Sequence, residues 1–391
     1  MPHRFLPTRP AAGNAGRRQW ARAAGRPSSA ARHRAGIHRY PWSAGALLCA
    51  VAIAALSACS SGQTSTNPNT SSKKHSGAIT ISYIQKQGDQ AYFVDEMSGA
   101  QQEAKQLGGV SIIPVNVGMD NTQTVAAVKN AIARKVNGII IVPPDGSTGP
   151  QDAALAKAAG IPIISSDDEV CTTSPNPDKC PPGKLLPRVG FDAQQLGTAV
   201  GKEVAVLFKK ESGWNASNTR ILEEWQFSTS VCTPRVTYAE KLFRSNGGPA
   251  AASIPAITVD TDNTTSGDPS SAFSKTQSTI NAYHGIKHWI VWGCNDQNVQ
   301  GAITALSDAG YSTSDILGVG LGGDVACKDW QSSAPTGMKA ALMFKGQTVG
   351  ADAVKAMVAH LRNGTPFPPV TAVSFTMANK SNWKSTGFVC H

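Results

Sequence analysis

The residues best suited to do chemistry in this sequence are polar groups that directly follow short apolar runs. They are carboxylates, amides, one Lys and one Arg, accompanied by two aromatic rings: Lys86, Gln87, Asp89, Asp145, Asp167, Asp168, Arg235, Asn295, Asp296 and Asp324, with Tyr92 and Phe93. A hydroxyl group can donate one hydrogen bond and accept others, so this mixture suits a polyhydroxylated ligand. Charged partners make the stronger bonds to hydroxyls. A phosphate site would instead show several basic groups or a glycine cradle. The residues therefore predict a neutral ligand rich in hydroxyls.

Enzyme and cofactor alternatives are weaker. Asp167 and Asp168 could be an acid–base couple, but adjacent residues at a strand end point in different directions. The glycines of Gly318–Gly323 fit the pattern G-x-G-x-x-G but lack the acidic residue that dinucleotide binding requires about 20 positions later. His284 and His288 lie around a predicted helix end and strand start, which does not favour a metal pair. We therefore expect no catalytic residue, cofactor or metal.

The elements that position these groups alternate along the chain from Ala78. Apolar, β-branched runs predict strands, and amphipathic stretches between them predict helices. Strands that are apolar throughout are typical of a parallel sheet covered on both faces. The first series has strands at 78–84, 110–116, 138–144 and 161–165, and helices at 89–107, 122–136 and 150–159. The right-handed crossover rule makes this a doubly wound α/β lobe.

A second series begins near Arg188 and predicts another lobe of the same kind. Its strands are 220–225, 252–260, 288–293 and 315–321, and its helices are 193–210, 233–245, 270–283 and 297–309. The closing strand 338–344, helix 349–362 and strand 370–376 are too few to fold alone. We expect them to pass between the lobes, with three crossings near Arg188, Met343 and Thr371.

This organisation predicts two lobes joined by a three-strand hinge. We place the N-terminal lobe at 78–188 plus 344–369, and the C-terminal lobe at 189–343 plus 370–391. Ligands of parallel sheets bind at the carboxyl ends of the strands. The polar groups described above would therefore meet in a crevice between the lobes.

The first 58 residues differ from the rest. They hold nine Arg and three His but no Lys, Asp or Glu, and they end in an uncharged apolar run from Pro41 to Ala58. This order is typical of a secretory leader. The apolar run is shorter than the roughly 20 residues that a membrane-spanning helix needs. We expect residues 1–58 to be removed.

The sequence Leu56-Ser57-Ala58-Cys59 resembles a bacterial lipobox, in which the Cys is acylated. The alternative is an ordinary small-residue cleavage site that happens to precede Cys59. Residues 59–77 are rich in Ser, Thr and Asn, as in a flexible tether, and favour the lipoprotein. Without the leader, 36 − 9 = 27 basic residues face 26 acidic ones, a net charge of +1. Nucleic-acid binding is therefore not predicted.

Six further Cys residues lie in the exported part. An even number in an exported chain indicates disulfides, with 15 possible connectivities. Cys171 and Cys180 bracket a short Pro-containing loop, and we expect them to pair. Cys232, Cys294, Cys327 and Cys390 remain open at this point. A metal site is not favoured, because no C-x2-C pair occurs.

Three segments resemble a known family: YIQKQGDQAYF, IPIISSDDE and IKHWIVWGCNDQNVQGAITALSDAGYSTSDILGVGLGG. They are similar to the type I periplasmic sugar-binding proteins, most closely the arabinose-binding members, over roughly residues 79–383. These proteins are non-enzymatic and close two lobes over a sugar. The resemblance implies that Lys86, Asp168, Arg235 and Asn295 bind the sugar, and that Tyr92 occupies the place of a ring-covering Trp.

The chain departs from the arabinose pattern at several of these positions. Gln90 stands where the pattern has Glu, and Gly322 stands where it has Asn, with Asp324 nearby. Asp167, Gln90 and Asp324 complete our set of expected ligand-binding residues. The departures leave the identity of the sugar open between pentoses, hexoses and related polyols. The same resemblance implies the pairings Cys232–Cys294 and Cys327–Cys390.

The expected function is capture of a small neutral sugar for an ABC permease. The protein would be a monomer outside the cytoplasm, held at the membrane by its lipid. The alternative is a ligand sensor that signals to a membrane kinase or chemoreceptor. A transcription regulator is disfavoured by the leader and by the lack of an N-terminal helix-turn-helix. A hydrolase is disfavoured because no nucleophile and base can be paired.

Overall fold

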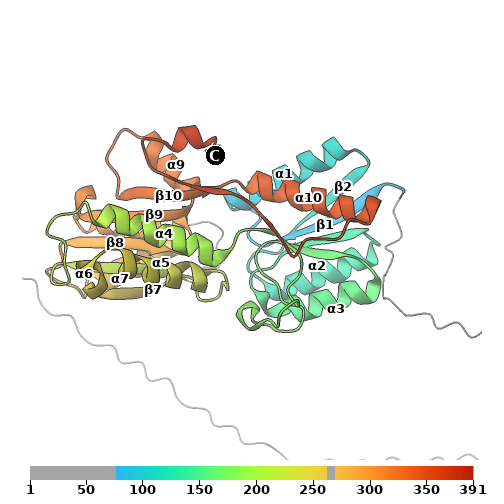
Figure 1. Cartoon of the computed structure of the whole chain (residues 1–391), viewed down its shortest axis with the longest axis horizontal. Coiled ribbons are helices and arrows are strands. Elements are labelled where there is room, and N and C mark those ends of the chain that lie inside the picture. The colour runs from blue at the N-terminus through green and yellow to red at the C-terminus, as the bar shows by residue number, and fades with distance from the viewer. Residues whose placement is uncertain (1–75, 262–268, 391) are drawn as a thin grey trace, which may run out of the picture. The chain divides into compact units, whose positions relative to one another are not determined.

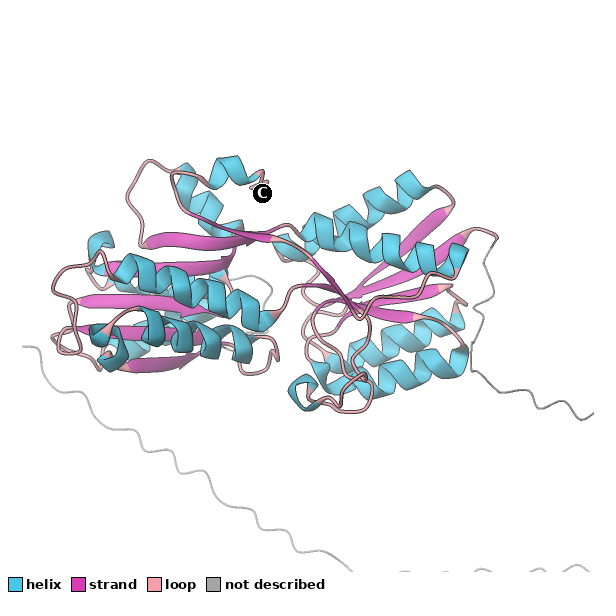
Figure 2. Cartoon of the chain, viewed as in Figure 1, coloured by secondary structure: helices cyan, strands magenta, loops and turns pink. Residues whose placement is uncertain are grey.

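In the computed structural model, which describes residues 76–261 and 269–390, the apolar runs form two six-stranded sheets with helices on both faces (Figures 1 and 2). The described residues all belong to one compact unit, 68–391. The predicted leader, Cys59 and nearly all of the predicted tether lie outside the described residues. No helix in the described ranges is long and apolar enough to cross a membrane.

The first sheet is parallel throughout and has the strand order β11-β5-β4-β3-β1-β2. Its central strand β3 is buried at every residue, as expected for a strand covered on both faces. The strands are β1 (Ile79–Gln85), β2 (Val110–Asn116), β3 (Gly138–Val142), β4 (Ile163–Asp167), β5 (Arg188–Gly190) and β11 (Val370–Ala372).

Four helices cover this sheet. The helices α1 and α10 lie side by side, and α2 packs against α3 (Figure 1). Their bounds are α1 (Ala91–Leu107), α2 (Asn121–Ala133), α3 (Gly149–Ala159) and α10 (Gly346–Asn363). Helix α10 thus joins the first sheet although it comes late in the chain, as predicted for the closing stretch.

The second sheet has the order β12-β10-β9-β8-β6-β7 and is parallel except for the β10–β12 pair. Strand β8 shows how it is covered, because Ile290 and Trp292 belong to one core cluster and Trp289 and Val291 to another. The strands are β6 (Thr219–Trp225), β7 (Ala256–Asp260), β8 (His288–Gly293), β9 (Ile316–Gly322), β10 (Met338–Phe344) and β12 (Phe375–Ala378).

The helices of the second sheet form the contact pairs α4–α5 and α7–α8. Their bounds are α4 (Ala193–Phe208), α5 (Cys232–Asn246), α6 (Pro249–Ser253), α7 (Ser270–Ile280), α8 (Asp296–Asp308) and α9 (Asp324–Gln331). Short 3-10 turns occupy Gly146–Thr148, Pro177–Lys179, Thr313–Asp315 and Trp383–Thr386. The predicted architecture of two doubly wound lobes is confirmed.

The chain crosses between the sheets three times, after β5, after β10 and after β11. These places match the predicted crossings near Arg188, Met343 and Thr371. Strands β5 and β11 pair within the first sheet, so the N-terminal lobe should extend to Gly190 at the first crossing and to Ala372 at the third. The exact lobe boundaries otherwise stay a prediction.

In each lobe, the helix that follows a crossing packs closely against a neighbouring helix. A glycine makes each of these contacts possible. A Cβ on Gly350 of α10 would overlap the carbonyl oxygen of Glu96 on α1. A Cβ on Gly197 of α4 would overlap the carbonyl oxygen of Arg235 on α5. The two helix pairs therefore touch backbone to backbone.

Two predicted strands differ in the structure. The predicted strand 370–376 is two strands, β11 and β12, which pair in different sheets. The predicted strand 252–260 begins only at Ala256, because α6 occupies Pro249–Ser253. Helix α9 was not predicted.

The described residues contain three disulfides: Cys171–Cys180, Cys232–Cys294 and Cys327–Cys390. The first is the local pair expected from the sequence. The other two are the pairs implied by the family resemblance.

Candidate ligand cleft

Residues from both sheets line one open cleft of about 480 Å³, including solvent at its mouth. The lining residues that belong to or follow elements of the first sheet are Lys86, Gln87, Gln90, Tyr92, Phe93 and Asp167, and those of the second are Gln226, Thr229, Val231, Arg235, Cys294, Asn295, Asp296, Gln297, Leu321, Gly322, Asp324 and Phe344. Most follow the carboxyl ends of strands, as the sequence predicted.

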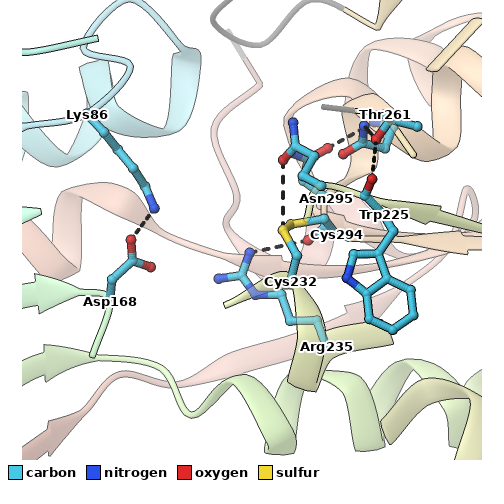
Figure 3. The surroundings of a disulfide bond; sticks show 10 residues. Lys86, Asp168, Trp225, Cys232, Arg235, Thr261, Cys294 and Asn295 are labelled. Carbon is cyan, nitrogen blue, oxygen red and sulfur yellow. Dashed lines mark hydrogen bonds and ion pairs between the residues drawn. A yellow bond between two sulfur atoms is a disulfide. The ribbon is translucent and has the colours of Figure 1, made fainter. Parts of the chain in front are cut away.

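Lys86 follows β1 and forms a buried ion pair with Asp168, which follows β4 (Figure 3). The two residues are 4% and 2% exposed. Asp168 itself is not among the lining residues, and its second carboxylate oxygen has no partner among the described residues. Lys86 therefore lines the cleft, while the carboxylate of Asp168 that pairs with its ammonium group does not.

Asp167 lines the cleft in an unusual backbone conformation, with φ of +60° at the end of β4. Its carbonyl oxygen accepts a hydrogen bond of 3.2 Å from Arg188. A Cβ at Gly190 would clash with the Asp167 backbone, so the neighbouring strand needs glycine there. Burial, followed by the charge of Asp168, raises the pKa of Asp167.

A buried network lies beside Asp167. Tyr83 Oη and Ser166 Oγ donate to Glu96 Oε1 over 2.7 and 2.6 Å, and Gln85 Nε2 donates to Oε2 over 3.2 Å. Burial, together with the charge of Asp167, raises the pKa of Glu96 to about 7. The network links β1, β4 and α1 beneath the cleft.

Aromatic rings form one wall of the cleft. Tyr92 packs edge-to-face against Phe93 and Phe344, with ring centroids 5.0 and 5.4 Å apart. The ring is 7% exposed and belongs to the core, yet its hydroxyl has no partner among the described residues. Tyr92 therefore combines core packing with a free hydroxyl at the cleft. Gln90, at the N-cap of α1, is 8% exposed and lies beside it in the lining.

Arg235 and Asn295 supply the polar groups on the other side (Figure 3). Arg235 Nη1 donates to the carbonyl oxygen of Cys294 over 3.2 Å, while Nε has no partner among the described residues. Asn295 caps α8 by accepting from the backbone N–H of Asn298 over 2.9 Å. Its Nδ2 lies 3.5 Å from Gln226 Oε1. Asn295 thus acts as a helix cap and still lines the cleft.

Asp296 and Asp324 place two carboxyl groups at the edge of this half. Asp296 Oδ2 accepts from the backbone N–H groups of Gly323, Val325 and Ala326 at 3.0, 2.8 and 3.3 Å, which satisfies the start of α9. Burial raises the pKa of both groups, and the charge of Asp296 raises that of Asp324 further.

The cleft gathers buried polar atoms that lack a partner in the described part of the chain. They are Tyr92 Oη, Asp167 Oδ1, Arg235 Nε and Asp296 Oδ1 in the lining, and Asp168 Oδ1 behind Lys86. Buried polar groups are normally hydrogen-bonded, so such a cluster needs an explanation. A ligand with several donors and acceptors would satisfy it.

Seven of the eight predicted ligand residues line this cleft, and the eighth, Asp168, contacts it through Lys86. Their contact with a ligand stays a prediction. The sequence analysis did not single out Phe344 or Gln297. Phe344 could have been found by applying the strand-end rule to β10. Among the described residues no group of His, Cys, Asp and Glu could hold a metal ion, and His288 pairs with Asp315 over 3.1 Å.

Comparisons with known proteins agree with this architecture. Residues 81–365 match the model of the periplasmic binding protein domain. The chain is 24% identical to the ABC transporter L-arabinose-binding periplasmic protein of Azospirillum brasilense, over 78% of this chain and 88% of that protein. It is also 24% identical to the L-arabinose-binding periplasmic protein of Escherichia coli, over 68% and 76%.

A solved structure shares the fold. The periplasmic solute-binding protein of an ABC transporter from Actinobacillus succinogenes, with bound D-allose, superposes with a TM-score of 0.65 at 22% identity, over 78% of this chain and 99% of that one. These relatives are solute-binding proteins and not enzymes, in agreement with the prediction from the sequence. The two sheets, the shared cleft and the match over residues 81–365 together establish that this chain belongs to the periplasmic binding protein family.

Proposed function

We propose that this protein captures a small neutral sugar or polyol outside the cytoplasm and delivers it to an ABC permease. The observation that carries the proposal is the set of unpartnered polar atoms that converge on one cleft from two sheets, beside an aromatic wall. The hydroxyl groups of a sugar can bond to these polar atoms, and its C–H face can pack against the aromatic rings.

The charges in the cleft favour an uncharged ligand. The charge of Lys86 is neutralised by its ion pair with Asp168. Arg235 is then the remaining cation among the described lining residues. Arg235 shares the lining with the carboxyl groups of Asp167, Asp296 and Asp324, so a sugar phosphate or sugar acid would find one unpaired cation beside three carboxyl groups among the described residues. The relatives named for L-arabinose and the structure with bound D-allose support the same ligand class. Pentoses, hexoses and cyclic polyols are the candidates.

Capture would proceed by closure of the two lobes about the three crossings. Closure buries the ligand and removes water from the groups around it, which strengthens their hydrogen bonds. No bond is made or broken, so the protein needs only to bind and release.

A ligand screen tests this function directly. Purified protein should melt at a higher temperature with its ligand than without it, because a ligand that binds only the folded state stabilises it. We expect a shift with at least one neutral pentose, hexose or polyol and none with the matching sugar phosphate. A micromolar dissociation constant by calorimetry corresponds to about 8 kcal/mol. A panel in which only charged sugars bind would contradict the proposal.

The membrane attachment is a separate part of the proposal. Cys59 would carry the lipid after removal of residues 1–58, and the mature monomer would stay at the outer face of the membrane. Cells fed a labelled fatty acid should incorporate it into the protein, and Cys59→Ala should abolish both the label and membrane retention. Label that persists in the Cys59→Ala variant would refute the anchor.

A further inference from the structure

A disulfide bond forms part of one wall of the cleft. The disulfide Cys232–Cys294 joins the first residue of α5 to the residue after β8 (Figure 3). Its residues are 0% and 2% exposed, and Cys294 lines the cleft. The bridge therefore connects the two segments that carry Arg235 and Asn295.

The bridge also contacts the polar groups of this half. The carbonyl oxygen of Cys294 accepts the 3.2 Å hydrogen bond of Arg235 Nη1. Cys232 Sγ lies 3.9 Å from Gln226 Oε1, which also lies within 3.5 Å of Asn295 Nδ2. Asn295 itself follows Cys294 directly in the chain. Three cleft side chains are thus connected to one disulfide.

The Arg235 guanidinium depends on this arrangement. Among the described residues, its only hydrogen-bond partner is the Cys294 carbonyl, and its buried Nε has no partner. Cys294 is held in turn by its backbone N–H, which donates to the carbonyl oxygen of Glu224 over 2.9 Å. The bridge therefore fixes the start of α5 against a strand end that is itself anchored in the sheet.

We propose that the Cys232–Cys294 disulfide is a positioning element of the ligand site, which acts by holding Arg235 in its binding orientation. This inference rests on the proposed function, because its readout is affinity for the neutral sugar. Without the bridge, α5 keeps its packing against α4, but the guanidinium loses its fixed distance to the Cys294 carbonyl. The ligand must then order this side chain as it binds, which weakens affinity.

A second disulfide provides a matched control. Cys327–Cys390 spans 63 residues and Cys232–Cys294 spans 62, so each cross-link constrains the unfolded chain to nearly the same extent. Neither Cys327 nor Cys390 lines the cleft. C232A/C294A and C327A/C390A should therefore lose similar thermal stability. Only C232A/C294A should lose affinity, by about tenfold or more, as for one charged hydrogen bond.

A double-mutant cycle tests whether the bridge acts through Arg235. In an Arg235→Met background, C232A/C294A should change the affinity less than about twofold, because the group it positions is already gone. Additive losses would overturn the proposal, as would equal affinity losses in the two disulfide variants or no loss in either. A wild-type protein that binds no neutral sugar overturns the proposed function and this inference together.

A second variant serves as a control for loss of folding. C232A/C294V replaces the volume of the two sulfurs and should fold if C232A/C294A does not. If neither variant folds while C327A/C390A does, the bridge is required for the fold itself and the positioning role is wrong.

Discussion

The two halves of the cleft hold their polar groups by different means. On the N-terminal side, side chains hold one another: Lys86 pairs with Asp168, and Glu96 collects three hydrogen-bond donors beneath Asp167. On the C-terminal side, a disulfide and backbone groups hold Arg235 and the loop after β8. The first half depends on charge pairing and side-chain hydrogen bonds, whereas the position of Arg235 in the second half depends mainly on covalent and backbone links. Changes in charge or pH should therefore affect the N-terminal half of the cleft most, and loss of the disulfide should affect the C-terminal half most.

The largest effect is expected where a buried charge loses its partner. Asp168→Asn leaves the ammonium group of Lys86 buried and unpaired, which should lower the free energy of unfolding by about 3–5 kcal/mol. The double variant K86M/D168L removes both charges and should recover most of this loss while still failing to bind sugar. Urea denaturation measures the stability. A single variant as stable as the wild type would show that this half does not rely on charge pairing.

The buried Glu96 should make the N-terminal half sensitive to pH. Its pKa of about 7 lies above the ordinary value of 4.5, so the folded state binds the proton more tightly than the unfolded state. Stability should therefore fall as pH rises from about 4.5 to about 7 and be level above that, by up to about 3 kcal/mol from this group. Glu96→Gln should flatten that part of the curve. Parallel wild-type and variant curves would assign the pH dependence to other carboxyl groups.

Loss of Arg235 should affect binding more than folding. Arg235→Ala removes a charged hydrogen-bond donor from the cleft, so affinity should fall by about 1.5–3 kcal/mol. Arg244 lies on the same helix and pairs with Glu240 at 2.8 Å, away from the lining residues. Arg244→Ala should therefore leave the affinity unchanged. Calorimetric titration compares the two, and equal affinities would remove Arg235 from the site.

The smallest effect is expected at Tyr92. Tyr92→Phe keeps the ring contacts with Phe344 and removes a buried hydroxyl that has no partner among the described residues. Folding stability should stay within about 0.5 kcal/mol of the wild type or rise, while affinity falls by about 1 kcal/mol. Unchanged affinity would mean that Tyr92 contributes only its ring to the aromatic wall.

The sequence was most informative where one local rule applied repeatedly. Uninterrupted apolar strands between helices predicted both lobes, and the strand-end rule predicted Asn295 and Asp324 in one cleft. These features depend on residues close together in the chain, so a single sequence is sufficient to find them.

Features that depend on distant partners could not be predicted from the residues alone. Helix α9 is short, and its N-terminus is satisfied by Asp296 from α8, so no local cap marks it. Strand 370–376 divides because its first part pairs with β5 and its last part with β10. The Lys86–Asp168 pair joins positions 82 residues apart.

The glycine contacts of the two helix pairs have a mechanical consequence. Helix α10 follows one crossing and touches α1 at the backbone of Glu96, and α4 follows another and touches α5 at the backbone of Arg235. No side chain lies between these backbones to take up slack. If the lobes rotate about the crossings, α10 would carry α1 with Tyr92, and α4 would carry α5 with Arg235, without a change in these helix contacts.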